Sequence, residues 1–314
     1  MPGLIIGVDI GGSKILSGII SPGGQILARK KEATPAGHSA GHIVDQICKT
    51  VMDLRRETGA KREDIQGMAV GAPGPLDYES GIIKDPPNIN WREFPLRDEL
   101  NKRLDVQLLL DNDANMAALG ELYFGSSKPC RHLIYMTVST GIGGGIIQGG
   151  KVYRGKDGAA GEFGRMIMAP AGGDLESLAS GTAMADTAEK LIQQGRGHGI
   201  MAFCSEGNPV TAREIGAAAR QGDPEALQII NHAGEFLGIA VANLVNIFNP
   251  ERVVLGGGAG LGLQDLLLPP VQYAVHTWVA PSLGKNLQVE FTALGEDIGL
   301  LGCAAAVLYE GMEN

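Results

Sequence analysis

Apolar positions along this chain alternate between short β-branched runs and longer stretches with helical spacing. Residues 5–8 and 134–138 are short apolar runs that lead into glycines, which predicts buried strands ending in tight turns. Residues 39–58 carry apolar side chains at every third or fourth position from Ile43 to Leu54, the spacing of one helix face. The pattern therefore predicts an α/β protein.

The same alternation continues to the C-terminal part of the chain. A stripe of apolar side chains over residues 236–248 predicts a buried helix, which Asn249 and Pro250 end. The strand 252–255 then leads into a third glycine-rich turn. Small apolar residues over 299–309 predict a last helix that folds back on the first half of the chain.

The two strands that lead into glycines begin a weak internal repeat. Each glycine turn, at residues 11–14 and 139–145, continues into another strand and then a hairpin closed on Gly-Gly. Glycine turns bind phosphate because backbone N–H groups and nearby hydroxyls can approach its oxygens closely. Neither turn has the spacing of a P-loop or of a dinucleotide-binding fingerprint.

The repeat predicts two lobes that grip one phosphate chain from opposite sides. The alternative is a pair of ordinary glycine-rich hairpins. Asp9 favours the first interpretation, because a carboxylate that ends a buried strand needs a metal ion or hydrogen bonds to offset its burial.

Residues 110–115 carry a candidate for proton transfer. A short apolar strand ends in Asp111, Asn112 and Asp113, and a helix is expected to begin near Ala114. An Asp at such a position can accept a proton from a hydroxyl held within about 3 Å. Alternatively, Asp113 only caps the helix. The segment by itself leaves both interpretations open.

Two other acidic residues are candidates for ligand binding. Glu162 stands between small residues in a Gly-Glu-Phe-Gly segment, which suggests a carboxylate packed beneath a ligand, and Glu176 is a similar candidate. The acidic residues around Asp98 and Asp105 are instead expected on solvated faces.

Composition excludes several function classes. The 314 residues are 44% hydrophobic and 19% charged, and 26 Lys plus Arg against 35 Asp plus Glu leave a net charge of −9, so no nucleic-acid surface is expected. No apolar run reaches membrane-spanning length and no signal peptide is evident, so we expect a cytoplasmic protein without membrane contact. The four dispersed cysteines encode neither a disulfide framework nor a thiolate zinc site.

Taken in order, seven motifs resemble those of the ROK family of sugar kinases, repressors and open reading frames, within the actin-like ATPase superfamily. They occupy residues 9–14, 71–77, 112–115, 139–145, 161–164, 175–181 and 254–258. The resemblance covers essentially the whole chain. It implies a two-lobed, ribonuclease H-like α/β fold with a cleft between the lobes, and often a homodimer. Residues 1–115 with 296–314 would form the N-terminal lobe, and residues 116–295 the C-terminal lobe.

The same resemblance implies transfer of the ATP γ-phosphoryl group to the 6-hydroxyl of a hexose. Asp113 matches the catalytic base of the family, and Asp9 would orient hydrated Mg²⁺. The positions that match sugar-binding residues are Gly74, Asn88, Asn112, Glu162 and Glu176. The positions that match ATP-binding residues are Gly11, Gly12, Ser13, Lys14, Thr140, Gly141 and Gly143 for the phosphates, with Gly257 and Gly258 against the adenosine.

The chain departs from the family pattern at Arg165. Family kinases commonly have a His there, followed by a cysteine cluster, and these residues bind a structural zinc ion. Here the stretch 166–174 contains no cysteine, so no structural zinc is expected. Arg165 offers only hydrogen-bond donors, so it would either bind a different sugar substituent or pair with a nearby carboxylate, and the pairing is favoured.

The resemblance therefore predicts a sugar kinase, with glucose as the leading substrate. The first alternative is a kinase for N-acetylmannosamine, N-acetylglucosamine or fructose, and the second is a sugar-sensing regulator without turnover. The regulator is disfavoured because Asp113 and both phosphate turns are present. Repressors of the family add a helix-turn-helix before the first glycine turn, whereas eight residues precede Asp9 here. The preferred sugar and the phosphoryl donor, ATP or polyphosphate, stay open.

Overall fold

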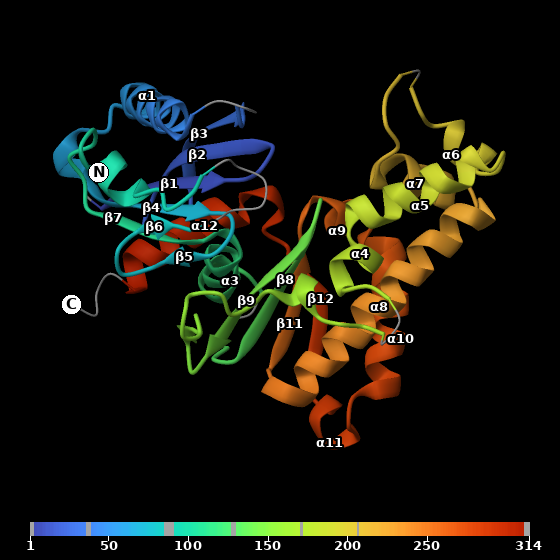
Figure 1. Cartoon of the computed structure of the whole chain (residues 1–314). Coiled ribbons are helices and arrows are strands. Elements are labelled where there is room, and N and C mark those ends of the chain that lie inside the picture. Colours follow the sequence, from blue (N-terminus) through green and yellow to red (C-terminus); the bar gives the residue numbers. More distant parts are fainter. Residues whose placement is uncertain are drawn as a thin grey trace. The chain divides into compact units, whose positions relative to one another are not determined.

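The chain forms two compact units (Figure 1), in a computed structural model that describes residues 3–35, 39–84, 91–126, 130–169, 172–205 and 207–310. Unit 1 comprises Met1–Arg131, Gly145–Gly161 and Glu296–Asn314, and unit 2 comprises His132–Gly144 and Glu162–Gly295. The lobes expected from the sequence stay a prediction. Unit 1 includes residues 116–131 and 145–161, which the expected N-terminal lobe does not. A boundary after residue 115 would cut the helix α3 (Asp113–Phe124).

Unit 1 is built on a mixed sheet with the strand order β3-β2-β1-β4-β7. Its strands are β1 (Leu4–Ile10), β2 (Lys14–Ile20), β3 (Ile26–Ala33), β4 (Ile65–Ala72) and β7 (Leu108–Asn112). The first three strands are joined as antiparallel hairpins, while β4 and β7 run parallel to β1. In the register Asp9 pairs with Gly71, and Gly71 pairs with Asp111. The parallel strands β1, β4 and β7 therefore bring the motifs at residues 9–14, 71–77 and 112–115 to the same end of the sheet, where these strands end.

Smaller elements surround this sheet. They are α1 (Ala40–Thr58), η1 (Arg62–Asp64), β5 (Leu76–Asp77), β6 (Ile82–Ile83), α2 (Leu96–Asn101), α3, η3 (Gly295–Asp297), α12 (Ile298–Ala305) and the π-helical turn η4 (Ala306–Glu310). The predicted helix over 39–58 is confirmed as α1, and the predicted last helix over 299–309 is confirmed as α12 with η4.

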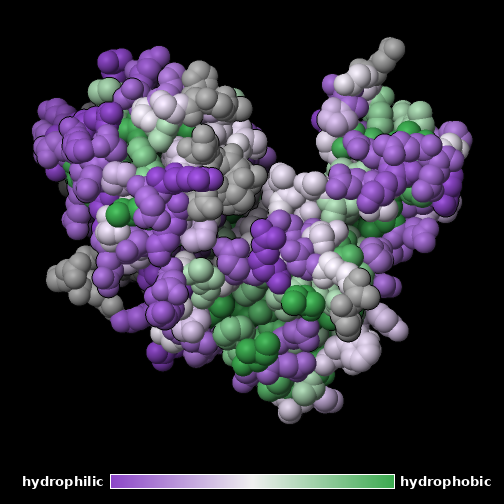
Figure 2. Space-filling view, in the orientation of Figure 1, coloured by the Kyte–Doolittle hydropathy of each residue, from purple (hydrophilic) through white to green (hydrophobic). Residues whose placement is uncertain are grey.

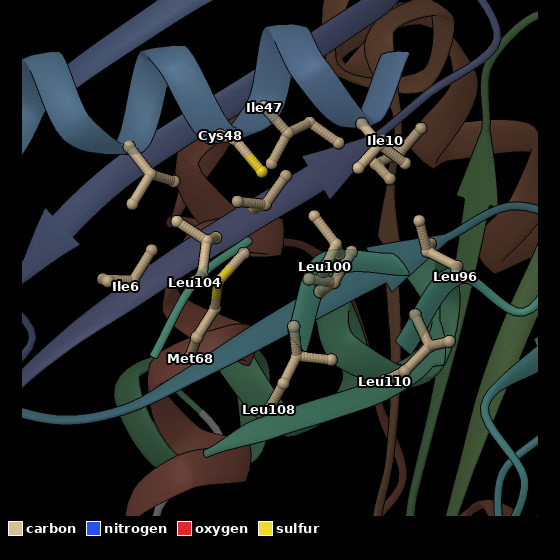
Figure 3. Close-up of a cluster of buried hydrophobic side chains, with 14 of the residues drawn as sticks. Ile6, Ile10, Ile47, Cys48, Met68, Leu96, Leu100, Leu104, Leu108 and Leu110 are labelled. Carbon is tan, nitrogen blue, oxygen red and sulfur yellow. The ribbon is translucent and has the colours of Figure 1, made fainter. Parts of the chain in front are cut away.

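Alternation along β1 explains why both faces of the sheet are covered. Ile6 and Ile10 point to one face, where they pack in a hydrophobic cluster with Ile47 of α1 and Leu108 of β7 (Figure 3). Gly7 lies on the other face, where a Cβ would come within 2.8 Å of Ile20 Cδ1 in β2 and 3.2 Å of Leu300 O in α12, so the helix packs closely on the strand. The C-terminal segment thus completes the core of unit 1, as predicted, because the sheet face beneath it is apolar.

The second sheet repeats the strand order of the first. It runs β10-β9-β8-β11-β12, with β8 (Leu133–Val138), β9 (Ile142–Gln148), β10 (Lys151–Val152), β11 (Arg252–Gly256) and β12 (Gln288–Phe291). In the first sheet a Gly-Gly hairpin joins β2 to β3, and in the second sheet one joins β9 to β10. The other three strands run parallel to one another in each sheet, namely β1, β4 and β7 in the first and β8, β11 and β12 in the second. The predicted internal repeat is therefore confirmed at the level of topology. Strand β9 continues from unit 2 into unit 1 at Gly145.

Helices make up most of the rest of unit 2. They are η2 (Phe163–Arg165), α4 (Leu175–Ala179), α5 (Gly181–Gln193), α6 (His198–Met201), α7 (Ala212–Arg220), α8 (Pro224–Phe248), α9 (Gly258–Gly262), α10 (Gln264–Trp278) and α11 (Pro281–Gly284). The predicted apolar stripe is the C-terminal half of α8, which ends at Asn249 in a left-handed conformation. Within the described ranges, no helix is both long and apolar enough to cross a membrane.

Candidate active site

The first glycine turn joins β1 to β2 and is braced by hydrogen bonds. Gly11 N donates to Lys14 O at 2.8 Å, and the Thr34 hydroxyl donates to Gly11 O at 2.7 Å. Thr34 N also donates to Ser13 O at 3.1 Å. Gly12 and Ser13 are exposed at the tip. The turn is thus a rigid, accessible loop. The sequence did not point to Thr34, because this residue lies at the far end of the next hairpin.

Asp9 lies at the end of β1, beside the start of α12. A Cβ on Gly299 would collide with the Asp9 carboxylate, so the two elements are in close contact. Burial raises the pKa of Asp9 to about 6, and the Lys14 ammonium partly opposes this rise. Lys14 Nζ itself lies 3.3 Å from Glu296 Oε2. A partly buried carboxylate that is costly to ionise gains from a nearby cation, which fits the predicted Mg²⁺ position.

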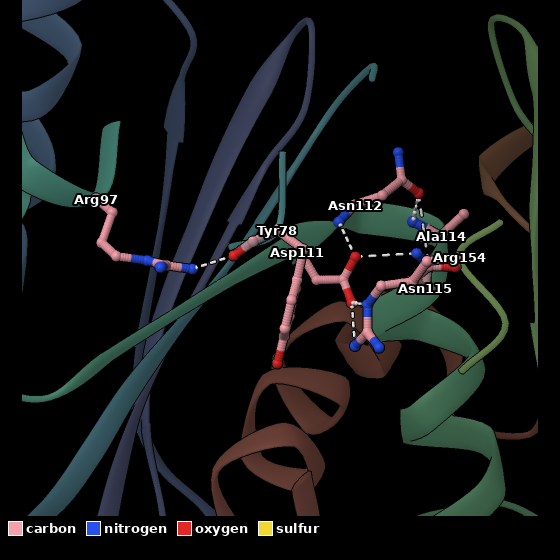
Figure 4. A network of polar contacts seen from close by, with 7 residues as sticks. All are labelled: Tyr78, Arg97, Asp111, Asn112, Ala114, Asn115 and Arg154. Atoms are coloured by element: carbon pink, nitrogen blue, oxygen red, sulfur yellow. Dashed lines mark hydrogen bonds and ion pairs between the residues drawn. The ribbon is translucent and has the colours of Figure 1, made fainter. Parts of the chain in front are cut away.

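Asn112, not Asp113, is the N-cap of α3. Its Oδ1 accepts hydrogen bonds from Ala114 N at 2.9 Å and Asn115 N at 3.4 Å (Figure 4). Asp113 is the first residue of the helix, and its Oδ1 accepts from Ala114 N at 2.9 Å. The interpretation of Asp113 as the helix cap is therefore wrong, because the preceding residue already has the extended backbone that an N-cap requires.

Gly74 lies close to Asn112, as expected for two residues of one binding site. Asn112 Nδ2 is 3.4 Å from Gly74 O. Gly74 has a φ of +82°, which other residues rarely adopt, so the turn after β4 depends on glycine here. Asn88, the other sugar-binding position expected in this half, lies outside the described residues.

The second glycine turn, in unit 2, is braced in the same way as the first. Ser139 N donates to Gly141 O at 2.9 Å, and the Thr182 hydroxyl donates to Thr140 O at 2.8 Å. Gly181 N also donates to Ser139 O at 2.8 Å. A threonine hydroxyl therefore accompanies each phosphate-turn candidate, Thr34 in unit 1 and Thr182 in unit 2.

Glu176 at the start of α4 lies against this turn. Its Oε2 accepts a hydrogen bond from Ile142 N at 2.8 Å, and a Cβ on Gly141 would collide with the same oxygen. Burial raises the pKa of Glu162, which Arg165 partly opposes and the Glu176 carboxylate reinforces. Unit 2 thus brings Glu162, Glu176 and Gly141 into one polar cluster.

The other predicted positions of unit 2 are placed as follows. Arg165 is 69% exposed and pairs with Asp174 at 3.3 Å, which is the carboxylate pairing given above as one of two alternatives. Gly143 lies within β9. Gly257 follows β11 with a φ of 85°, and Gly258 begins α9. In the part of the chain that the structure describes, no group of three or more His, Cys, Asp or Glu side chains could hold a metal ion. The expected absence of zinc stays a prediction.

Two sheets of one strand order, each with a braced glycine turn at the end of a strand, define an actin-like ATPase fold. Residues 5–310 match the sequence profile of the ROK family, and the chain belongs to that family. Both the expected family and the expected fold class are confirmed.

Similar proteins include kinases and a repressor. The chain is 32% identical to a glucokinase of Halalkalibacterium halodurans, over 95% of this chain and 92% of that protein. It superposes with a TM-score of 0.84 and 34% identity on a ROK family glucokinase from Streptomyces griseus in complex with glucose and AMPPNP, covering 96% of this chain and 98% of the other. It is also 31% identical to the xylose repressor of Caldicellulosiruptor bescii, over 98% of this chain and 78% of the repressor.

Proposed function

We propose that this protein is an ATP-dependent glucokinase, which transfers the γ-phosphoryl group of ATP to the 6-hydroxyl of glucose. The observation that carries the proposal is the place of Asp113. It stands in the first turn of α3, at the sheet edge that also holds the first glycine turn, and Asn112 performs the capping in its place. Full-length similarity to glucokinases supports glucose as the acceptor.

In this proposal Asp113 accepts the proton of the attacking hydroxyl, which contributes about 10²- to 10⁴-fold to the rate. Asn112, Glu162 and Glu176 form hydrogen bonds with other sugar hydroxyls. Gly74 and Asn88 belong to the same proposed sugar site. Phosphoryl transfer otherwise needs positioning and charge neutralisation more than covalent chemistry. The backbone N–H groups around Gly12 and Gly141 serve that need, as does the Lys14 ammonium.

Mg²⁺ would neutralise charge on the ATP phosphates, and Asp9 is the residue that would hold its water shell. The raised pKa of Asp9 supports this assignment, since a neighbouring cation relieves the cost of its charge. We assign Arg165 to its ion pair with Asp174, so it would orient the segment after Glu162 and would not bind the sugar directly. We also propose that no structural zinc is present.

We further propose a homodimer. Unit 2 exposes the large side chains Ile247, Tyr273 and Trp278, which are 70%, 74% and 63% exposed. Figure 2 shows hydrophobic residues gathered near the C-terminal end of α8. Exposed apolar surface of this kind is typical of protein contacts. Light scattering should give twice the mass of the chain, and a monomer at micromolar concentration would refute the dimer.

One assay tests the proposed function against its alternatives. Purified protein is given ATP or polyphosphate with glucose, N-acetylmannosamine, N-acetylglucosamine or fructose, and product formation is followed. We expect the highest kcat/KM for glucose with ATP. The similarity to a xylose repressor favours the regulator as second candidate, and binding of a sugar without any turnover would support it.

A further inference from the structure

A buried carboxylate beside Asp113 has no part in the chemistry described so far. Asp111 is the second-to-last residue of strand β7 and is 2% exposed. Its Oδ1 accepts from Asn112 N at 2.7 Å and from Asn115 Nδ2 at 2.9 Å. Its Oδ2 accepts from Arg154 Nε at 2.8 Å and lies 2.7 Å from Arg154 Nη2 (Figure 4). Four donors therefore converge on one carboxylate, from the strand, the helix and the segment after β10.

Arg154 is itself held in place by its surroundings. Its guanidinium carbon lies 4.0 Å from the centre of the Tyr78 ring, so one face of the group stacks on an aromatic side chain. The segment closes on itself through a hydrogen bond from Ala160 N to Arg154 O at 3.0 Å. At Gly158 it lies so close to Leu76 O that a Cβ would collide. Arg154 thus reaches Asp111 from a constrained backbone.

Asn112, which is proposed to bind the sugar, and Asp113, which is proposed to activate it, lie between Asp111 and Asn115 in the sequence. Asp111 directly precedes Asn112 and Asp113, and Asn115 stands two residues after Asp113. Because Asp111 is bonded to the backbone of Asn112 and to the side chain of Asn115, the first turn of α3 cannot rotate without breaking a buried, charge-assisted hydrogen bond. The orientation of Asp113 toward a sugar hydroxyl depends on that turn.

We propose that Asp111 and Arg154 are a positioning pair, which fixes Asn112 and Asp113 in the geometry needed for phosphoryl transfer to the sugar. This inference rests on the proposed kinase function. Arg154 supplies two donors in a fixed fork, so it sets the direction of the carboxylate as well as balancing its charge. Neither residue needs to touch the sugar. A buried ion pair is by itself weak evidence that the pair stabilises the fold. A functional test must therefore decide whether Asp111 and Arg154 position Asn112 and Asp113 or only contribute to stability.

The test compares variants of the pair with a matched control. Arg154→Met removes the fork and Arg154→Lys keeps only the charge. The double variant Asp111→Asn with Arg154→Met removes both charges, so that no unpaired charge is left buried. Arg252→Met is the control, because Arg252 is 20% exposed, against 21% for Arg154, and also pairs with a carboxylate, Glu290. For each protein, kcat, the KM values for glucose and ATP, and the melting temperature are measured.

We expect Arg154→Met to lower kcat/KM for glucose by about 10²-fold, since small misplacements of a catalytic group have effects of that size. The KM for ATP should not change. Arg154→Lys should recover part of the loss. The double variant should regain the wild-type melting temperature but not the turnover, and Arg252→Met should keep wild-type kinetics.

Three results would overturn the positioning role: wild-type kinetics in Arg154→Met, wild-type turnover in the double variant, or an equal rise of both KM values. If Arg154→Met does not fold, the double variant decides. A wild-type chain that phosphorylates none of the sugars would refute the proposed function and this inference with it. An active wild-type chain with normal variants would refute the inference alone.

Discussion

The Glu176 carboxylate and the backbone of Ile142 are joined by a hydrogen bond of 2.8 Å, from Ile142 N to Glu176 Oε2. Glu176 is a proposed sugar-binding residue, whereas Ile142 directly follows Thr140 and Gly141 of the second glycine turn. One side chain therefore connects two parts of the candidate site that the sequence treats as separate motifs.

This relationship predicts different effects for two substitutions of Glu176. Glu176→Gln keeps an oxygen that can accept from Ile142 N, so the KM for ATP should stay near wild type while that for glucose rises. Glu176→Ala also removes the brace on the turn. A hydrogen bond to a charged group contributes about 1.5–3 kcal/mol, so the KM for ATP should rise by roughly 10- to 100-fold in this variant.

Steady-state kinetics with each substrate varied in turn will measure both effects. Asp186→Asn, an exposed position on α5, is the control. Equal KM values for ATP in the Gln and Ala variants would show that the Ile142 hydrogen bond has no influence on the turn.

Asp113→Asn should abolish phosphorylation while glucose still binds. The amide keeps the shape of the side chain and can still accept from Ala114 N, but it cannot take the proton, so kcat should fall by at least about 10²-fold. Because Asn112 is the cap, the melting temperature should not change. Coupled-assay turnover, calorimetric glucose binding and thermal melting test these three expectations.

The companion variant Asn112→Ala should behave in the opposite way on stability. Loss of an N-cap costs about 1 kcal/mol, so this variant should melt at a lower temperature. Near-normal turnover in Asp113→Asn would remove Asp113 from the role of base.

Asp9→Asn should make the protein more stable and inactive at neutral pH. The folded-state pKa of Asp9, about 6, lies above the ordinary value of 3.8, so ionisation opposes folding. That cost is absent at low pH, grows as the pH rises between the two values and is complete above about pH 6. The variant should therefore gain up to about 3 kcal/mol in the free energy of unfolding at neutral pH, and the gain should shrink toward about pH 4.

Urea denaturation of the wild type and the variant across this pH range, without Mg²⁺, will measure the difference. Asp105→Asn is the control, because its side chain is 97% exposed. A gain from Asp9→Asn that is the same at every pH would show that burial of the charge is not its cause.

The purified protein should hold no stoichiometric zinc and should keep its melting temperature in EDTA, while catalysis should need added Mg²⁺. Arg165 and the cysteine-free stretch 166–174 are the reason, because they leave none of the usual thiolate or imidazole ligands. Elemental analysis and melting with and without EDTA test the prediction. One tightly bound zinc per chain would contradict it.

Much of the fold could be predicted because the signals are local. The strand over residues 5–8, the Gly-Gly hairpins and the apolar face of α1 depend on spacing within a few residues, and each was confirmed. Placement of the last helix against the first sheet was also predicted, since a helix that is apolar throughout must be buried. The identity of the α3 cap was not predicted, because Asn112, Asp113 and Asn115 are all suitable residue types and only the backbone angles distinguish them.

The sequence alone identified the two glycine turns, Asp9 and Asp113 as candidate site residues, because the residue types at turns and strand ends are visible along the chain. The partners of the long polar side chains depended on the tertiary structure. Arg154 meets Asp111 across 43 positions of sequence, and Lys14 meets Glu296 across 282. No local pattern encodes such pairs, because a flexible side chain finds its partner only after strands and helices have brought distant backbones within a few ångströms of each other.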